Sequence, residues 1–413
     1  MKTLWIIDHY SSEPKYGGYT RQYNLAKGIS QQGFNVVVIA SSFSHFRHEY
    51  ISEKEFFITE ISQNIHFIYL KTANYISHVS VKRFWGMIDF ILKIKKYSHI
   101  IKNSFGSPDW VVASSPHIFD WVAGEIIAKQ YNAIYNIEIR DFWPLELRQK
   151  DDSLTRRTLY CFFDYLETRA FKNAKHIICT MPYGQTYCSD FNKPCAEKFV
   201  FIGHPLDCEN YDKFALQNWH LLPKEIRNFV KESFYCVFSG YYMKYEGVYK
   251  MLEAAKQLPH IKFVFVGNGD EKDGMLNFVK QNDMTNVYIG DRIEKQAVPA
   301  LLSHSNICLA YLFHPENPLM FKYGISKNKV NEYLYSGAVT LMGLAGEQNE
   351  IVDSGGGYTF EPISNDFANL INRVYNMEPE TRKKMGEKAR RYMLKEHSIT
   401  AIAKKYVTAV LHD

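Results

Sequence analysis

Apolar runs alternate with helical periods along the whole chain, in the order typical of parallel α/β domains. In the first half, short runs rich in valine and isoleucine show no alternation of apolar and polar positions, which predicts strands buried on both faces. These runs are 3–7, 35–40, 65–70, 110–113, 133–138, 176–180 and 199–202. Between them, the 3.6-residue apolar period of helices recurs at 18–32, 81–102, 117–130 and 154–173. The pattern predicts a Rossmann-like domain.

The same alternation restarts after a polar, irregular segment at 204–224. The predicted strands and helices of this second half are 234–239, 248–258, 262–267, 272–282, 287–289, 298–303 and 307–312. A chain of 413 residues exceeds one ordinary core. We therefore expect two domains, 1–205 and 206–394, whose strand ends face each other across a cleft. The charged helical stretch at the end is expected to return, so that about 395–413 completes the first domain.

Composition narrows the class of protein. A hydrophobic content of 46% with 23% charged residues describes a soluble globular chain, and a net charge of +5 argues against a dedicated nucleic-acid binder. The seven cysteines are scattered, without a CxxC motif or a histidine cluster, so we expect reduced thiols and no zinc. The first apolar run is too short for a signal peptide, and no stretch approaches the ~20 apolar residues of a membrane span. We expect a cytoplasmic protein.

The segment YGISKNKVNEYLYSGAVT (323–340) carries the clearest binding pattern. A loop with Gly324 and Ser326 leads into a predicted helix that ends at Gly337, before an apolar strand. Free N–H groups at a helix N-terminus bind phosphate well. Glu332 follows about one turn later and could accept hydrogen bonds from the two hydroxyls of a ribose. The segment therefore predicts a site for a nucleotide diphosphate.

Two further loops follow strands of the second half. In SGYYMKYEG (239–247), which includes Gly240, Lys244 could offset the charge of a diphosphate, although a solvated lysine is the ordinary alternative. In VGNGD, the residues Gly267, Asn268 and Gly269 would let a flat base lie against the backbone, although this motif alone indicates only a turn.

Polar residues also follow strands of the first half. Gly17 and Gly18 would allow close approach of a ligand, or form a simple turn and helix cap. In IEIRDFWP, Glu138, Arg140 and Asp141 would either form an internal ion pair or orient an acceptor hydroxyl, with Asp141 as its base or orienter. His117, in the segment SSPH that also follows a predicted strand, could line the floor of the same site.

The stretch 81–102 is both basic and aromatic. A basic amphipathic helix can lie in a membrane interface and bring an enzyme to a lipid-linked acceptor. An ordinary surface helix with its apolar stripe in the core fits the same sequence, so both interpretations stay open.

The order of these segments resembles the retaining, GT-B-fold glycosyltransferases of the large family 4 type over nearly the whole chain. The GISKNK and RDFWP segments look most like a bacterial subgroup that builds surface polysaccharides such as lipopolysaccharide and capsule. The resemblance implies that the second domain binds the donor and the first the acceptor. The implied donor-binding residues are Gly240, Gly267, Asn268, Gly269, Gly324, Ile325, Ser326, Lys329 and Glu332, with Lys244 at the diphosphate. The implied acceptor-side residues are Asp141, Arg140, Gly17, Gly18, Glu138 and His117.

The chain departs from the family pattern in three places, one of which is GHPLD (203–207), where many relatives have Asn-Gly-Val-Asp. Many members carry two glutamates flanking seven residues, but here the first position is Gly324. Glu246 stands where lysine is frequent, which leaves Lys244 and Lys329 as the candidates for the diphosphate.

The resemblance implies transfer of a hexosyl or N-acetylhexosaminyl group from a nucleotide-diphosphate sugar, most readily a UDP-sugar. The acceptor would be a glycan or polyprenyl-linked glycan, met on the cytoplasmic face of the membrane. Helix N-termini and Lys244 would stabilise the leaving diphosphate without a cofactor or metal, in agreement with the lack of a DxD-like acidic pair in the second half. Two alternatives remain: a nucleotide-sugar 2-epimerase, which needs no acceptor, and a catalytically silent subunit that binds a partner transferase.

Overall fold

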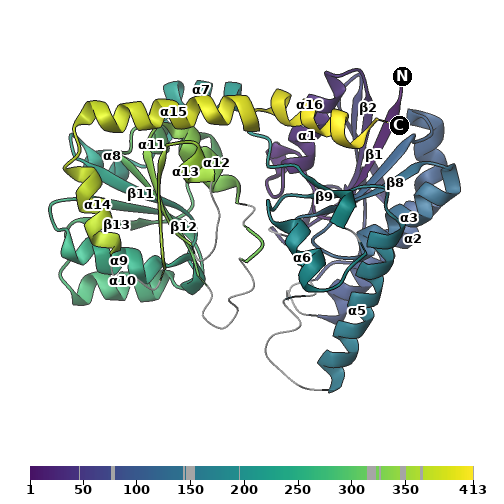
Figure 1. Ribbon diagram of the computed structural model, residues 1–413, viewed down its shortest axis with the longest axis horizontal. Helices are drawn as coiled ribbons and strands as arrows, with labels where there is room; N and C mark the ends of the chain where they lie inside the picture. The colour runs from purple at the N-terminus through teal and green to yellow at the C-terminus, as the bar shows by residue number, and fades with distance from the viewer. Residues whose placement is uncertain are drawn as a thin grey trace. The chain divides into compact units, whose positions relative to one another are not determined.

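The chain divides into two compact units, Met1–Pro205 with Ile399–Asp413, and Leu206–Ser398. A computed structural model describes residues 1–45, 47–75, 80–142, 145, 154–194, 196–313, 322–324, 327–344, 350–362 and 366–412. Each unit is built on one twisted, largely parallel sheet with helices on both faces (Figure 1). The predicted pair of Rossmann-like domains is therefore confirmed.

The first unit contains an eight-stranded sheet in the order β10-β9-β8-β7-β1-β2-β6-β5. Its strands are β1 (Thr3–Ile7), β2 (Asn35–Ser41), β5 (Phe56–Ser62), β6 (Ile65–Leu70), β7 (Trp110–Ser114), β8 (Ile134–Ile139), β9 (Ile177–Cys179) and β10 (Phe199–Phe201). Only β5, at the edge, pairs antiparallel to its neighbour in this sheet. The short strands β3 (Phe43–Ser44) and β4 (Glu49–Tyr50) form a separate hairpin.

Helices cover both faces of this sheet (Figure 1). They are α1 (Arg21–Ser30), α2 (Val81–Phe105), α3 (Phe119–Tyr131), α5 (Leu154–Asn173), α6 (Gly184–Asp190) and α16 (Ile399–Val410). Leu4 and Ile6 of β1 share a buried cluster with Leu25 of α1 and Ile402 of α16. A Cβ atom on Gly28 of α1 would lie 2.6 Å from the Cβ of Ala403, so α1 and α16 pack too closely for a larger residue there. The predicted return of the C-terminal helix to the first unit is confirmed.

The second unit contains six parallel strands in the order β13-β12-β11-β14-β15-β16. They are β11 (Tyr235–Tyr241), β12 (Lys262–Asn268), β13 (Val287–Gly290), β14 (Ile307–Leu312), β15 (Val339–Leu344) and β16 (Gly357–Phe360). The helices are α7 (Cys208–Gln217), α8 (Lys224–Val230), α9 (Val248–Gln257), α10 (Lys272–Gln281), α11 (Val298–Ser303), α12 (Asn328–Ser336), α13 (Glu350–Asp353), α14 (Phe367–Tyr375) and α15 (Pro379–His397). Val237 and Phe238, adjacent in β11, belong to different core clusters, as expected for a sheet buried on both faces.

The structure corrects two expectations. The segment 204–224 is not irregular throughout, because α7 lies within it, capped by the Asp207 carboxylate, which accepts from Asn210 N–H. Cys188 is disulfide-bonded, so the expectation of reduced thiols is wrong at that position. Among the cysteines that the structure describes, the free thiols are Cys161, Cys179, Cys208, Cys236 and Cys308.

Candidate functional site

In the second unit, helix α12 is fastened to strand β11 near the carboxyl end of that strand. The Tyr333 hydroxyl accepts a hydrogen bond from Ser239 N–H at 2.8 Å and donates one to the Ser239 carbonyl at 3.1 Å. The helix ends where Gly337 adopts a left-handed conformation with φ of 90°, the C-cap that the sequence predicted. These contacts place the first turns of α12 beside the ends of the central strands, where ligands bind in open α/β sheets.

Glu332 on α12 presents a carboxylate that is open to a ligand. Its side chain is partly buried, and burial raises its pKa while Lys295 acts to lower it. Among the residues that the structure describes, none forms a hydrogen bond or ion pair with this carboxylate. Both of its oxygens can therefore accept hydrogen bonds from a bound molecule.

Glu246 joins two lysines of the α12 segment into one charged group. Its carboxylate is buried, forms an ion pair with Lys329 and lies 3.4 Å from the Nζ of Lys327. Burial opposes ionisation of Glu246, but the two lysines outweigh it and hold its pKa below the ordinary value. Lys329 also lies over the ring of Phe238, with 4.5 Å between its Nζ and the ring centroid. With both lysines protonated and Glu246 ionised, this group carries one net positive charge. From the sequence, Glu246 had indicated only that a lysine common in the family is missing at this position.

The glycines at the ends of β11 and β12 allow two backbones to touch. Gly240 and Gly267 are paired in register, and a Cβ on Gly267 would lie 1.8 Å from the Gly240 carbonyl oxygen. A Cβ on Gly269 would lie 2.4 Å from the Tyr242 carbonyl oxygen. Packing alone therefore requires these two glycines. A Cβ on Gly240 would lie 3.3 Å from the Nζ of Lys329, so this strand end adjoins the charged group.

The remaining predicted donor residues have different surroundings. Lys244 is exposed in a short 3-10 turn (η4, Lys244–Glu246), and Asn268 is exposed at the end of β12 with its side-chain oxygen accepting from Gly269 N–H at 3.0 Å. Gly324 has φ of 93°, a conformation that favours glycine. Ile325 and Ser326 lie outside the described residues.

In the first unit, Glu138 is occupied by internal contacts. It is fully buried at the end of β8, where one oxygen accepts from Arg21 Nε at 2.8 Å. The other accepts from Gln22 Nε2 at 2.6 Å and from Ser114 Oγ at 3.0 Å. Burial opposes its ionisation, but Arg21 and Arg140 hold its pKa below the ordinary value. These contacts connect the ends of β7 and β8 to the start of α1.

A second carboxylate, Asp8 at the end of β1, pairs with Arg140. The Arg140 Nη1 lies 3.2 Å from Asp8 Oδ2, and its guanidinium lies over the ring of Tyr19 at 4.4 Å from the centroid. Burial raises the pKa of Asp8 to about 6 even though Arg140 acts to lower it. Asp141, which follows Arg140 in the chain, is exposed. Asp8 was missed as a site residue, although a polar residue directly after a buried strand is the signal that could have found it.

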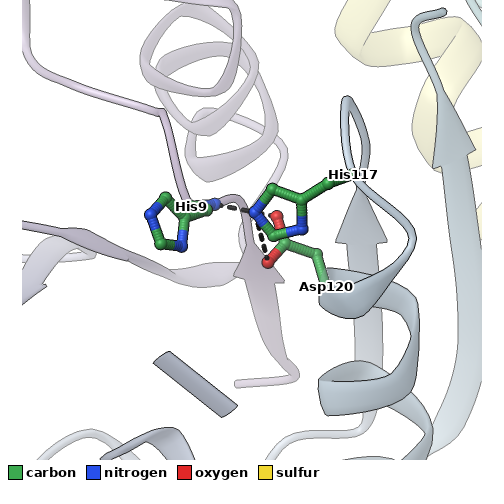
Figure 2. Close-up of side chains that lie close together, drawn as sticks. All are labelled: His9, His117 and Asp120. Atoms are coloured by element: carbon green, nitrogen blue, oxygen red, sulfur yellow. Dashed lines mark hydrogen bonds and ion pairs between the residues drawn. The ribbon is translucent and has the colours of Figure 1, made fainter. Parts of the chain in front are cut away.

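The other acceptor-side residues also follow strands of this sheet. Gly17 and Gly18 both adopt positive φ, 75° and 90°, in the loop between β1 and α1. His117 is buried after β7 beside His9 and Asp120, two residues that sequence reasoning missed (Figure 2). The structure thus brings Asp8, Arg140, Glu138 and His117 to the carboxyl edge of one sheet.

Helix α2 has a buried apolar face and also exposed apolar side chains, so it fits both interpretations that the sequence left open. Met87, Phe90 and Ile94 are buried, whereas Trp85 is 58% and Leu92 60% exposed. No helix in the described ranges is long and apolar enough to span a membrane.

Comparisons with known proteins agree with this architecture. Residues 248–408 match a family model described as glycosyl transferase-like. No curated protein sequence matches the chain.

Solved structures match along the whole length. Sucrose-phosphate synthase from Thermosynechococcus elongatus has a TM-score of 0.71 at 13% identity, covering 98% of this chain and 97% of that one. WaaG, a glycosyltransferase involved in lipopolysaccharide biosynthesis, has a TM-score of 0.64 at 15% identity, covering 98% and 99%. HepE from Anabaena, in complex with UDP and glucose, has a TM-score of 0.64 at 13% identity, covering 99% of both chains.

The chain therefore has the GT-B fold of glycosyltransferases. The glycosyl transferase-like match covers most of the second unit, which includes α12 and Glu332, and extends into the returning helix α16.

Proposed function

We propose that the protein is a retaining glycosyltransferase that moves a hexosyl or N-acetylhexosaminyl group from a nucleotide-diphosphate sugar, preferably a UDP-sugar. The acceptor is a hydroxyl of a glycan or lipid-linked glycan in bacterial polysaccharide synthesis. The glycosyl transferase-like match over 248–408 supports the class. The similar fold of HepE, which has been solved with UDP and glucose, supports the choice of donor. The similar fold of WaaG, a glycosyltransferase involved in lipopolysaccharide biosynthesis, supports the pathway.

The open carboxylate of Glu332 is the observation that carries the proposal. Glu138, at the end of β8, has both carboxylate oxygens hydrogen-bonded to neighbouring side chains. Neither carboxylate oxygen of Glu332 is hydrogen-bonded to any described residue. A half-buried carboxylate costs desolvation energy that a ligand hydroxyl pair would repay. Its position one turn into α12 suits a ribose whose diphosphate lies at the helix N-terminus.

The diphosphate leaving group needs positive charge that is in place before the reaction. We assign that role to the N-terminus of α12 and to exposed Lys244, without a metal. Lys329 contributes through the net charge of its group with Glu246 and Lys327. The base would lie beside Gly267, Asn268 and Gly269.

The acceptor belongs to the first unit in this proposal. Exposed Asp141 is the candidate for orienting the acceptor hydroxyl, while Arg140, held by Asp8, fixes the loop that carries it. The exposed apolar side chains of α2 would contact the cytoplasmic face of the membrane and bring the enzyme to a lipid-linked acceptor.

Donor turnover tests this proposal directly. Purified protein is incubated with UDP-, GDP- and dTDP-sugars, with and without membrane lipid extract, and release of nucleoside diphosphate is measured. We expect release from one donor and stimulation by the extract. We also expect a fall in kcat/KM of about 100-fold or more for Glu332→Ala, because two hydrogen bonds to a charged group are lost.

The matched control is Glu253→Gln, an exposed glutamate of α9 in the same unit, which should turn over donor at the wild-type rate. Conversion of the donor to an epimer without acceptor would favour an epimerase. If no donor is turned over and no nucleotide binds, the proposal that the protein is an enzyme is wrong, and a catalytically silent subunit is favoured.

A further inference from the structure

Three potential metal ligands from distant parts of the chain meet in the first unit. His9 follows β1, His117 follows β7, and Asp120 lies in the first turn of α3 (Figure 2). One ligand atom from each residue lies within 4.8 Å of the other two. All three side chains are at most 1% exposed.

Four buried polar atoms of this cluster have no hydrogen-bond partner within the described part of the chain: His9 Nδ1, His117 Nδ1, His117 Nε2 and Asp120 Oδ1. Each such atom ordinarily costs about 1–3 kcal/mol. Four such atoms on three neighbouring side chains call for a common explanation, because native proteins leave few buried polar atoms unsatisfied.

The backbone already orients the carboxylate toward the histidines. His9 N–H donates to Asp120 Oδ2 at 2.9 Å, which leaves Oδ1 directed to His117 Nε2 at 3.7 Å (Figure 2). An outer hydrogen bond of this kind is typical of carboxylates that bind metal ions.

The walls of the cluster are aromatic. The rings of Phe90 and Tyr10 lie edge-on to His9, with centroids 4.6 and 4.7 Å away, and Tyr10 also lies 5.4 Å from His117. A neutral imidazole offers one nitrogen lone pair to a metal ion, and each of the two rings has at least one ring nitrogen that accepts no hydrogen bond from the described residues.

We propose that His9, His117 and Asp120 bind one divalent transition-metal ion, with Zn²⁺ as the best match to two imidazoles and one carboxylate. Tetrahedral zinc would bring the ligand atoms to about 3.4 Å from one another. Because they now lie within 4.8 Å of one another, each pair would approach by at most about 1.4 Å. The ion would hold the ends of β1 and β7 to α3. A water molecule would supply the fourth ligand. The site lies in the first unit, separate from the metal-free donor chemistry proposed for the second, and a search of the cysteines could not have found it.

Metal binding can be measured without any donor or acceptor. The full chain is treated with a chelator, dialysed, and titrated with Zn²⁺ or Co²⁺; bound metal is counted by mass spectrometry and thermal unfolding is followed by circular dichroism. We expect one equivalent of bound metal, Co²⁺ absorption bands of a four-coordinate site, and a rise of about 3 °C or more in the unfolding midpoint.

Three variants distinguish this site from other histidines and thiols. Asp120→Asn keeps an oxygen for His9 N–H but loses the anionic ligand, and His117→Gln removes an imidazole; both should lose the bound equivalent and the shift in midpoint. His66→Gln changes another buried histidine of the same unit, on β6, and should retain both.

Two results would overturn the proposal: wild-type protein that binds no stoichiometric metal, or a folded Asp120→Asn protein that binds metal as the wild type does. If His117→Gln fails to fold, the Asp120→Asn protein decides alone, because its side chain is nearly isosteric with the original.

Discussion

At the scale of single residues, the partners of a buried charge separate structural groups from groups available to a ligand. Glu138 receives three hydrogen bonds and ties α1 to the sheet, whereas Glu332 receives none from the described chain. Both are glutamates on the strand-end side of a parallel sheet, so residue type alone does not distinguish them. The free energy of desolvation is offset by the protein in the first case and is left for a ligand in the second.

Glu167 of α5 offers a test of buried charge that does not touch the proposed site. It is fully buried, accepts from Tyr187 Oη at 2.9 Å and lies 3.1 Å from Lys193 Nζ. Burial outweighs Lys193 and raises its pKa from 4.5 to about 7. The folded protein therefore holds this proton to higher pH than the unfolded chain, and the associated stability is present below pH 4.5 and lost as pH rises through 7.

We expect the free energy of unfolding of the wild type, relative to Glu167→Gln, to fall by about 3 kcal/mol between pH 4.5 and 8. Glutamine preserves the shape, and Lys193 keeps Asp164 at 2.6 Å, so the variant adds no unpaired charge. Urea unfolding of both proteins across this range measures the difference. A difference that stays constant with pH would show that Glu167 does not titrate as described. Asp8 is a poorer choice, because its removal leaves Arg140 buried without its carboxylate.

At the scale of elements, α2 combines a core face with an exposed apolar and basic face. Phe90 and Ile94 are fully buried, while Val81 is 74% and Trp85 58% exposed, near exposed Lys82. Such a surface costs little free energy if it meets lipid head groups and acyl chains instead of water.

We expect Trp85→Ser to weaken binding to vesicles containing anionic lipid by about tenfold, because burial of a large apolar side chain contributes roughly 1.5–3 kcal/mol. Sedimentation with vesicles of anionic and of neutral lipid measures this, and the neutral vesicles should bind the wild type less. Leu216→Ser is the matched control, since Leu216 is 86% exposed in the second unit. Equal loss for both variants, or none for either, would contradict a specific role for α2.

At the scale of the whole molecule, each unit has its own sheet and core, and the chain passes between them at 205–206 and again at 398–399. The proposed functions divide in the same way, with the donor in 206–398 and the acceptor in 1–205. Because a ligand stabilises the segment that it binds, the division can be tested by hydrogen exchange.

We expect UDP to slow amide exchange in α12 and at the ends of β11 and β12, while the core strands β1 and β2 exchange as in the free protein. Mass spectrometry of peptides measures this along the chain, and Glu332→Ala should abolish the protection. Protection confined to 1–205 would place the nucleotide in the first unit and reverse the proposed roles.

The sequence determined most of the elements because a strand buried on both faces must be continuously apolar. Strands β1, β6 and β14 and helices α5 and α11 have the predicted bounds. Strand β5 was missed because it lies at the sheet edge with a mixed burial pattern, and α7 because its sequence is largely polar with few buried residues. Local pattern also placed Glu332 on a helix and Gly337 at its end, since both depend only on neighbouring residues.

Only the tertiary structure decided which charged and polar residues meet. Lys329 and Glu246 are 83 residues apart, His9 and Asp120 are 111 apart, and Arg140 and Asp8 are 132 apart. In a parallel sheet every connection is a long crossover, and strands adjacent in space need not be adjacent in sequence. The sequence shows which polar residues follow strands, but the order of strands in the sheet decides which of them become partners.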